Sequence, residues 1–539
     1  MFIYPGASLF VLIKVQSLFE MVVPRVPHLF ISFSTGHGHA VPILSFARRL
    51  INTPNALSDT GATHGHKILV TIAIVDTFAD ELVATGFIPS PDEHAVILRG
   101  SYGEVRLVKL HDLLVIDPQK DGKYPSKGFQ CYIESARQTG SAIERYLREQ
   151  QNPNNLHPVT AVILDTFIVR SCPKTPNAGL PFYIIMTTGF STSPDTMFPL
   201  PPLDMKADVP YDQDVRMDSI SPDNFGLIFA QRHRAATLLP ECRGFLWNTV
   251  DGIEGDILQT SKVWQANYPG VPVRFLGPLN WIDSVDNSVP STASSAATAQ
   301  KDSRLQKQQA IDAYVRQWMD SQEDASVLFV AFGSVTVTTP EQKVEQLRGL
   351  ISSGRRILWV LRGSMEPIFP YVQNHPGIPE GMLVAHSNIK VGDKPGEVVI
   401  VPWAPQRDIL AHRATAAFLT HCGWNSTMEA LMYARPTLGW PGFCDQADSA
   451  NFLKKLGVGI NFPDTAAPVV GPVPSMESAR VVPHDEITER INELFASENF
   501  PQFVANAKKY SLAMRSAWNI PDGSSYLALV NFVAELDKF

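Results

Sequence analysis

Polar residues that could bind an anion are gathered in the stretch 403–446. An apolar segment ends there in the turn 421–426, which opens a helical pattern. Backbone N–H groups and the helix dipole favour an anion at a helix start, so a phosphate group would suit this turn. The turn holds no Lys or Arg, so the N–H groups, His421, Asn425 and Ser426 would have to hold the charge.

Further positions in the same stretch fit a nucleotide. Glu429, one helical turn past Asn425, could reach the paired hydroxyls of a ribose. Trp403 ends an apolar segment and offers a flat face on which a base could stack. Each residue alone also has an ordinary role: a helix cap in the turn, a core tryptophan, a solvated glutamate, and Asp445 and Gln446 as turn residues. Their occurrence together favours a nucleotide site.

A second chemically capable segment is the loop 35–42, TGHGHAVP, which holds His37 and His39. It is close to the dinucleotide fingerprint GxGxxG, but Val41 stands where the third glycine is needed, and Asp59 is the acidic residue near the required distance. A metal site is the other alternative, weakened because two histidines lack further ligands at a matching spacing.

The elements needed to position these residues alternate along the chain. Strands are expected over 27–34, 67–74, 159–164, 182–186 and 244–249, and a helix is expected from Pro42, because proline suits a first helical turn. Beyond residue 302, strands are expected over 326–332, 356–361, 397–401 and 416–420, and helices over 341–352 and 426–433. Apolar strands separated by helical lengths predict parallel sheets covered on both faces, hence two doubly wound α/β domains in tandem.

Residues 283–302 are rich in Ser, Ala and Thr and lack an apolar period, so they are expected to form a flexible linker. The expected domains are therefore 22–282 and 303–518, with residues 519–539 crossing back onto the first domain. Residues 1–21 are expected to form an N-terminal extension. Its apolar part has no preceding basic residue and is too short to span a bilayer, although a weak membrane anchor or secretory signal is the alternative.

Composition excludes several classes of protein. The 539 residues carry 45 basic and 53 acidic side chains, a formal charge of −8 and 45% hydrophobic residues. This is the composition of a globular protein, and an acidic excess without a basic run argues against nucleic-acid binding. The five cysteines are scattered and lack CxxC spacing, so neither a disulfide framework nor a zinc site is indicated, and a reducing, cytoplasmic location is expected.

The stretch 403–446 contains, in this order, the motifs WAPQ and HCGWNS, Glu429, a proline-rich segment and Asp445-Gln446. This order and spacing resemble the nucleotide-sugar signature of UDP-dependent glycosyltransferases of the plant-secondary-product type. GFLWNTVDGIEGDIL, FLGPL, VRQWMDSQ, VLFVAFGS, ILWVLR and DGSS look like further landmarks of that family. Ser449-Ala450 depart from its usual Asn-Ala. The resemblance implies the GT-B fold, in which two Rossmann-like domains face each other across a cleft.

By this resemblance the second domain binds a UDP-sugar. Trp403 would stack on the uracil, and Gln406 and Glu429 would bind the ribose. The residues implied for the diphosphate are Ser334, His421, Asn425 and Ser426. Those implied for the sugar are Trp424, Asp445, Gln446 and, in the first domain, Thr187. A Gln rather than a His at the end of the signature favours UDP-glucose over UDP-galactose in the family.

The family pattern Gly-His-x-x-Pro matches Gly38, His39 and Pro42, which singles out His39 over His37 as the catalytic base. An acceptor hydroxyl must lose its proton as it attacks the anomeric carbon, and a neutral imidazole suits that task. The helix start is expected to lower the pKa of His39. Asp165 ends an apolar strand and would orient His39 and stabilise its imidazolium, as in a Ser-His-Asp triad.

A competing metal site is Asp212-Gln213-Asp214, the DxD pattern by which another class of glycosyltransferases holds a metal and the sugar diphosphate. No strand leads into it, so a solvated loop is the better interpretation, and no metal is expected.

The expected function is an inverting transfer of glucose from UDP-glucose to a hydroxyl of a small lipophilic acceptor. No cofactor is expected beyond the donor, and no nucleic-acid partner, no stable membrane span and no partner subunit. An NAD-dependent oxidoreductase and a non-catalytic nucleotide-sugar-binding protein are the alternatives. The sequence does not identify the acceptor, because the first-domain loops expected to contact it carry no motif.

Overall fold

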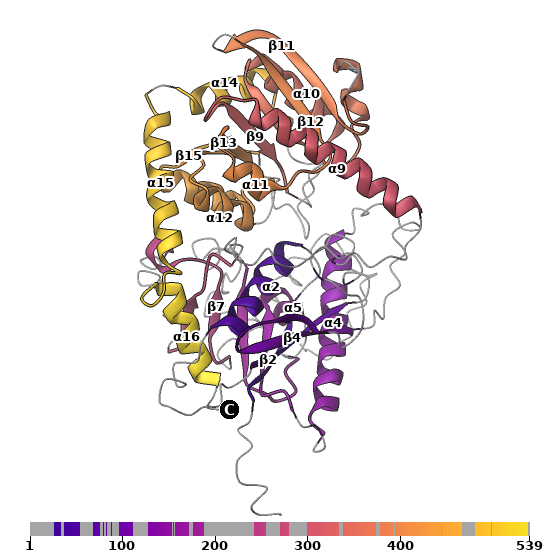
Figure 1. The fold of residues 1–539 in the computed structure, drawn as a ribbon, viewed down its shortest axis with the longest axis vertical. Helices are drawn as coiled ribbons and strands as arrows, with labels where there is room; N and C mark the ends of the chain where they lie inside the picture. The colour runs from indigo at the N-terminus through magenta and orange to yellow at the C-terminus, as the bar shows by residue number, and fades with distance from the viewer. Residues whose placement is uncertain are drawn as a thin grey trace, which may run out of the picture.

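Two sheets, each flanked by helices, form two domains stacked along the long axis of the molecule (Figure 1). The coordinates are those of a computed structural model. It describes residues 26–33, 37–53, 68–75, 79, 82, 88, 96–110, 128–152, 155, 157–171, 176–187, 242–254, 270–279, 299–333, 338–372, 378–391, 394–442, 445–465, 480–496 and 498–536. The expected extension 1–21 and the DxD pattern at 212–214 lie outside these residues.

The sheet of the first domain has the order β3-β4-β2-β1-β5-β6-β7-β8. Only β3 is antiparallel to its neighbour within this order, and the other pairings are parallel. Its strands are β1 (His28–Ser32), β2 (Ile68–Val75), β3 (Val96–Arg99), β4 (Gly103–Leu110), β5 (Ala161–Asp165), β6 (Phe182–Met186), β7 (Phe245–Trp247) and β8 (Val273–Phe275). The chain crosses from one side of β1 to the other between β4 and β5, so the topological switch lies between β1 and β5.

Both faces of the central strands β1, β5 and β6 are buried, which explains why these strands are mostly apolar. Leu29 and Ile31 of β1 pack in one cluster with α2 (His37–Asn52), while Phe30 points to the opposite face and packs in a cluster with α4 (Gly128–Gln150) and α5 (Thr166–Ser171). This alternation is the period-two pattern of a strand whose two faces are both covered.

The sheet of the second domain has the order β11-β12-β10-β9-β13-β14-β15, and its switch lies between β9 and β13. The strands are β9 (Val327–Ala331), β10 (Arg356–Val360), β11 (Leu383–Val391), β12 (Lys394–Val401), β13 (Thr415–Thr420), β14 (Thr437–Gly439) and β15 (Gly459–Asn461). Its helices are α9 (Ala299–Asp320), α10 (Pro340–Ser352), the 3-10 helix η5 (Glu366–Tyr371), α11 (Gln406–Ala411), α12 (Trp424–Met432), α13 (Gln446–Lys455), α14 (His484–Leu494) and α15 (Phe500–Ser516).

The two faces of β9 again pack in different clusters. Leu328 and Val330 lie with α10 and α14, and Phe329 lies with α9 and α11. The expectation of two doubly wound α/β domains is therefore confirmed. The antiparallel strands β3 and β11 at the sheet edges were not among the expected elements, because β3 is short and polar residues interrupt β11, so neither has a long apolar run.

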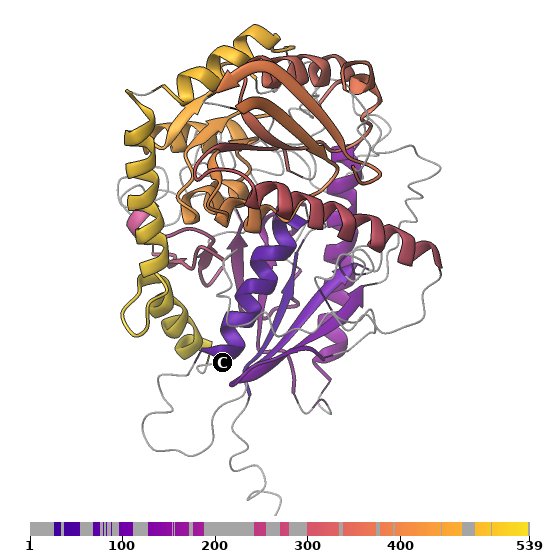
Figure 2. The same ribbon diagram turned by 45° about the horizontal axis from the view of Figure 1, so that its top comes forward.

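The last helix, α16 (Ser524–Leu536), returns to the first domain after α15 has run along the second (Figure 2). Leu529, Phe532 and Val533 of α16 belong to the same apolar cluster as α2. Tyr183 Oη donates to Glu535 at 2.6 Å, and Arg274 forms an ion pair with the same carboxylate. The chain thus joins the two domains twice.

Two local expectations need correction. The helix that follows β1 begins at His37, so Pro42 lies inside α2 rather than in its first turn. The helix α9 begins at Ala299, which shortens the expected linker 283–302 by its last residues. The reason is that the segment after Ala299 is rich in helix-favouring residues and buries Ile311 and Val315 against the sheet.

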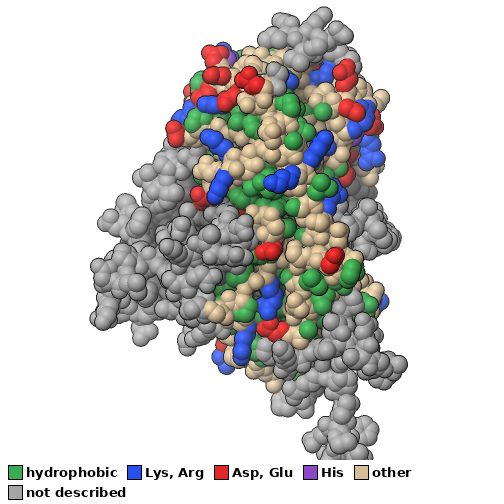
Figure 3. Space-filling view, turned by 90° about the vertical axis from the view of Figure 1, so that its left-hand side faces the viewer, with side chains coloured by type: hydrophobic (Ala, Val, Ile, Leu, Met, Phe, Trp, Pro, Cys, Tyr) green, Lys and Arg blue, Asp and Glu red, His purple; other side chains and the backbone are tan. Residues whose placement is uncertain are grey.

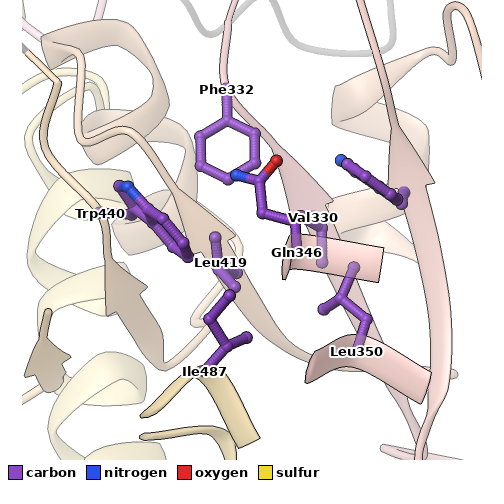
Figure 4. Close-up of a pocket in the computed structure, with 8 residues that line it drawn as sticks. Val330, Phe332, Gln346, Leu350, Leu419, Trp440 and Ile487 are labelled. Carbon is purple, nitrogen blue, oxygen red and sulfur yellow. The ribbon is translucent and has the colours of Figure 1, made fainter. Parts of the chain in front are cut away.

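Apolar, basic, acidic and neutral side chains are interspersed on the face shown in Figure 3, which carries α15 and α16. A narrow gap in the second domain's core is shown in Figure 4, and its lining is Val330, Phe332, Gln346, Leu350, Trp359, Leu419, Trp440 and Ile487. None of the expected donor-binding residues lines this gap. No described helix has both the length and the apolar character needed to cross a bilayer.

Candidate active site

The two topological switch points face the same region between the domains. In open α/β sheets, ligands bind at the carboxyl ends of the strands where the strand order reverses. In the first domain, α2 follows β1 and Asp165 ends the neighbouring strand β5. In the second domain, α12 follows β13, which pairs with β9. The hydrogen bond from Asn425 Nδ2 of α12 to the Gly38 carbonyl of α2, at 2.8 Å, joins these two places.

His39 and Asp165 form a buried pair. Nδ1 of His39 lies 2.6 Å from Oδ2 of Asp165, whose side chain is 1% exposed. Thr187 Oγ1 lies 3.1 Å from the same ring nitrogen. A neutral imidazole carries one proton, so a proton on Nδ1 that is donated to Asp165 leaves the lone pair on Nε2. This is the tautomer that a general base needs.

The electrostatics of His39 differ from the expectation based on the helix start. Burial alone lowers the pKa of the ring, but the charge of Asp165, its hydrogen bond and the charge of Asp445 together raise the pKa above 6.5. The expected lowering is therefore wrong. The carboxylates raise the pKa because they stabilise the imidazolium directly, at close range, in a partly desolvated position. The same interaction would stabilise His39 after it has accepted a proton.

The start of α12 is built to receive an anion. Gly423 precedes the helix, and none of the described side chains caps its first turn. The N–H groups of that turn are therefore available to a ligand. Cys422 has a left-handed backbone, with φ of 61°, at the point where the chain turns from β13 into the helix.

His421 lies in a space that only glycines permit. A Cβ atom on Gly333 or on Gly423 would come within 2.5 Å of Nε2 of His421. Burial lowers the pKa of His421 to about 4, so its imidazole is neutral near pH 7. Its Nδ1 is buried and has no hydrogen-bond partner among the described residues. The ring can therefore take part in hydrogen bonding to a ligand, but it brings no positive charge.

The residues expected at the ribose and the base lie together. Gln406 Nε2 is 2.6 Å from Oε2 of Glu429 and 3.1 Å from Oγ of Ser426. Burial raises the pKa of Glu429, and the hydrogen bond from Gln406 opposes that shift. Trp403, at the end of β12, is 40% exposed, unlike the buried core tryptophans such as Trp359. An exposed indole beside a polar cluster is suited to stacking on a flat ligand.

The side chain of Trp424, for which the family resemblance implied a sugar contact, lies against the first domain. Its side chain is 3% exposed, and its Nε1 donates to the Asn248 carbonyl of the first domain at 2.7 Å. The indole packs in one cluster with Val250 of the first domain and Met428 of α12. Trp424 is large and apolar, with one donor group, so burial against the other domain satisfies both properties. Its ring is an interdomain contact.

Asp445 and Gln446 lie at the start of α13. Oε1 of Gln446 accepts a hydrogen bond from the Gly442 N–H at 2.8 Å, which fixes that side chain against the preceding loop. Burial raises the pKa of Asp445 to about 6, while the positive charge of protonated His39 opposes that shift. The electrostatic interaction between Asp445 and His39 runs across the domain boundary, so the end of the signature faces the catalytic pair.

Two candidate groups lie outside the described residues, namely Ser334 and the side chain of His37. Asn248 and the Gly38 carbonyl were not identified from the sequence as parts of the site. Asn248 lies in the family motif of residues 244–258, but the sequence analysis assigned it no role. The hydrogen-bond partner of a backbone carbonyl cannot be predicted from the residue type.

Among the described residues, no group of three or more His, Cys, Asp or Glu side chains is arranged to hold a metal ion.

Comparisons with known proteins show which proteins this chain is similar to. Residues 289–465 match the family described as UDP-glucoronosyl and UDP-glucosyl transferase. UDP-glycosyltransferase 71K2 of Pyrus communis is 28% identical over 79% of this chain and 83% of its own length. UDP-glucose flavonoid 3-O-glucosyltransferase 6 of Fragaria ananassa is 31% identical over 58% of this chain and 57% of its own length.

Among solved structures, a UDP-glucosyltransferase from Polygonum tinctorium capable of glucosylating indoxyl, in complex with 3,4-dichloroaniline, superposes with a TM-score of 0.62. It is 22% identical, and the match covers 96% of this chain and 100% of that chain.

Proposed function

This chain belongs to the UDP-dependent glycosyltransferases, and from that membership we propose that it transfers glucose from UDP-glucose to a hydroxyl of a small lipophilic acceptor. The products are a β-glucoside and UDP. The observation that carries the proposal is the His39–Asp165 pair at 2.6 Å, joined through Gly38 and Asn425 to the start of α12. This hydrogen bond brings the proposed base close to the helix start proposed to bind the diphosphate.

The reaction is a single displacement. Nε2 of His39 takes the proton of the acceptor hydroxyl as its oxygen forms the bond to the anomeric carbon. The bond from that carbon to the diphosphate breaks, and its electron pair leaves with UDP. Attack from the face opposite to the leaving group inverts the α-linkage of the donor. Asp165 orients the ring and stabilises the imidazolium, with Thr187 at the same ring nitrogen.

The donor would be held by the second domain. Trp403 would stack on the uracil, and Gln406 and Glu429 would bind the ribose, a role supported by their hydrogen bond and by the exposure of the indole. The first-turn N–H groups of α12 would stabilise the charge that develops on the leaving diphosphate. The side chains proposed to assist at the diphosphate and the sugar are Ser334, His421, Asn425, Ser426, Asp445 and Gln446.

The names of two similar proteins support the choice of substrates. The Fragaria ananassa relative is named for UDP-glucose and a flavonoid, and the Polygonum tinctorium protein for glucosylating indoxyl. Both acceptors are small and largely apolar, which agrees with the proposed acceptor class. We also propose metal-independent turnover, a cytoplasmic location and a monomer, none of which these names address.

The test is an acceptor screen with UDP-glucose, read by the mass increase of one hexose. His39→Ala is expected to lower turnover by on the order of 10²- to 10⁴-fold while UDP still binds. Turnover within a few-fold of wild type would contradict the assignment of the base. UDP binding without transfer to any acceptor would favour a non-catalytic binding protein, and a nicotinamide fluorescence change without UDP binding would favour an oxidoreductase.

The same assay tests metal independence. Turnover is expected to be unchanged by excess chelator. A loss that added manganese reverses would contradict the proposal and would direct attention to Asp212-Gln213-Asp214.

A further inference from the structure

The starting observation is the position of Pro42 in α2. In an α-helix the N–H of each residue donates to the carbonyl four residues earlier. Proline has no N–H, so Pro42, inside α2, leaves the Gly38 carbonyl without its usual partner in the helix. That same carbonyl accepts the hydrogen bond from Asn425 Nδ2 of the other domain, at 2.8 Å.

The two ends of this hydrogen bond adjoin the two halves of the proposed reaction. Gly38 precedes His39, whose ring is held by Asp165. Asn425 lies in the first turn of α12, between Trp424, which binds the Asn248 carbonyl, and Ser426, which accepts from Gln406. A change in this hydrogen bond would therefore alter the separation of the base from the helix start.

We propose that Pro42 is a positioning residue: by leaving the Gly38 carbonyl open to Asn425, it holds His39 in register with the diphosphate-binding start of α12. A residue with an N–H at position 42 would supply the Gly38 carbonyl with a donor inside its own helix. The interdomain hydrogen bond then competes with a local one and weakens. This inference rests on the proposed glucosyl transfer for its catalytic consequence, but the hydrogen bond itself does not.

The choice of Asn at position 425 fits the same role. Its amide has a donor for the carbonyl and also an acceptor, whereas an aspartate could not donate to Gly38. The donor group is the one that faces the first domain. Asn425 is therefore placed to serve the domain contact as well as the proposed diphosphate site.

Pro42→Ala tests the proposal, because it restores the helix N–H without touching Asn425. The midpoint of unfolding is expected to rise or stay unchanged, since a proline is removed from a helix interior. In spite of that, kcat/KM is expected to fall by roughly three- to tenfold, the size of one weakened hydrogen bond, while the Kd of UDP stays unchanged. The matched control is Pro501→Ala, which removes an exposed proline from the first turn of α15 and should leave kcat/KM unaltered.

A double-mutant cycle separates the hydrogen bond from the loss of the proline ring. If Pro42 acts through Asn425, Pro42→Ala has no further effect on kcat/KM in an Asn425→Ala background. An equal loss in both backgrounds, or no loss in the wild-type background, would overturn the proposal.

A readout that does not need turnover is hydrogen–deuterium exchange of the unliganded protein. Pro42→Ala and Asn425→Ala are both expected to speed exchange in peptides that cover residues 423–428, while Pro501→Ala does not. Unchanged exchange in both variants would refute the interdomain hydrogen bond. Faster exchange in a protein that transfers no sugar would instead support the contact and count against the proposed function.

Discussion

At the scale of single residues, two carboxylates from different domains raise the pKa of His39, the proposed base. Asp165 lies in direct contact with His39, and Asp445 acts on it from the second domain. Burial opposes their effect, yet the pKa of His39 is raised. A base whose pKa lies near the working pH combines a usable unprotonated fraction with a strong pull on the proton.

Asp165→Asn is expected to move the acid side of the pH profile to lower pH. His39 must be unprotonated to act, so kcat/KM falls as the pH drops through its pKa. Asp165 raises that pKa by charge and hydrogen bonding, so removing the charge lowers the pKa and shifts the loss of activity downward. The maximal rate should also fall, on the order of 10²- to 10⁴-fold, because Asn no longer holds the tautomer. Rates measured from pH 5 to 9 give both quantities.

Asp445 is the control for this profile. Burial raises the pKa of Asp445 to about 6, so this carboxyl group titrates within the measured range of pH 5 to 9. Asp445→Asn removes that titration and a smaller contribution to the pKa of His39, so it should shift the profile less than Asp165→Asn does. A larger shift from Asp445→Asn would contradict the dominance of Asp165.

Trp403→Ala is expected to weaken UDP binding without lowering stability. Loss of base stacking costs about 1–3 kcal/mol, which is roughly a 5- to 150-fold increase in Kd. The indole is 40% exposed, so its removal leaves little cavity. Calorimetric titration with UDP measures the effect, and Trp403→Phe, which keeps an aromatic face, should recover much of the affinity. Equal affinity in the alanine variant would remove Trp403 from the uracil site.

At the scale of elements, α16 belongs to the first domain although it ends the chain. Phe532 is fully buried and lies with its ring centroid 5.0 Å from that of Tyr183 and 6.1 Å from that of Phe46. Ser525 Oγ donates to the Gly277 carbonyl at 2.7 Å, which fixes the start of the helix. The first domain therefore completes its core only when the last helix has docked.

Phe532→Ala should destabilise the first domain by about 3–5 kcal/mol, the usual cost of truncating a buried aromatic side chain. Leu527→Ala is the matched control on the same helix, because Leu527 is 44% exposed and should change stability by less than about 0.5 kcal/mol. Urea unfolding followed by circular dichroism compares the two variants. Similar losses in both would contradict the docking of α16 through its buried face.

At the scale of the whole molecule, α12 links the domains and also begins at the proposed diphosphate site. Trp424 and Met428 share an apolar cluster with Val250 of the first domain and Met514 of α15. Hydrogen bonds from Trp424 to the Asn248 carbonyl and from Asn425 to the Gly38 carbonyl lie beside that cluster. The domain contact and the proposed donor site therefore use the same turn of one helix.

Trp424→Phe distinguishes an interdomain contact from a sugar contact. The Asn248 carbonyl would lose its donor and the cluster would lose volume, so stability should fall by about 1–3 kcal/mol. The ratio of the Kd values for UDP-glucose and UDP should stay the same, because the ring does not face the sugar. Denaturant unfolding and paired titrations measure both. A changed ratio at full stability would return Trp424 to the sugar site.

The sequence by itself determined the fold class and brought together the residues proposed for the ribose of the donor. Strand β9 is apolar along its whole length and β5 is apolar up to Asp165 at its end, because both faces of each strand are covered, and this pattern can be recognised in the sequence. Gln406, Ser426 and Glu429 are close in the sequence, on α11 and α12, so their signature is local and their meeting could be predicted.

Only the tertiary structure decided what depends on contacts between distant segments. Asp165 and Asp445 set the pKa of His39 from positions far along the chain, and their balance against burial has no local signal. The position of the Trp424 ring also has no local signal, because a tryptophan at this place in the sequence is compatible with a sugar contact and with an interdomain contact. The open carbonyl of Gly38 is a backbone group, and its partner Asn425 comes from the other domain. Local patterns specify elements and contiguous motifs, whereas electrostatic coupling and domain contacts arise only when the chain has folded.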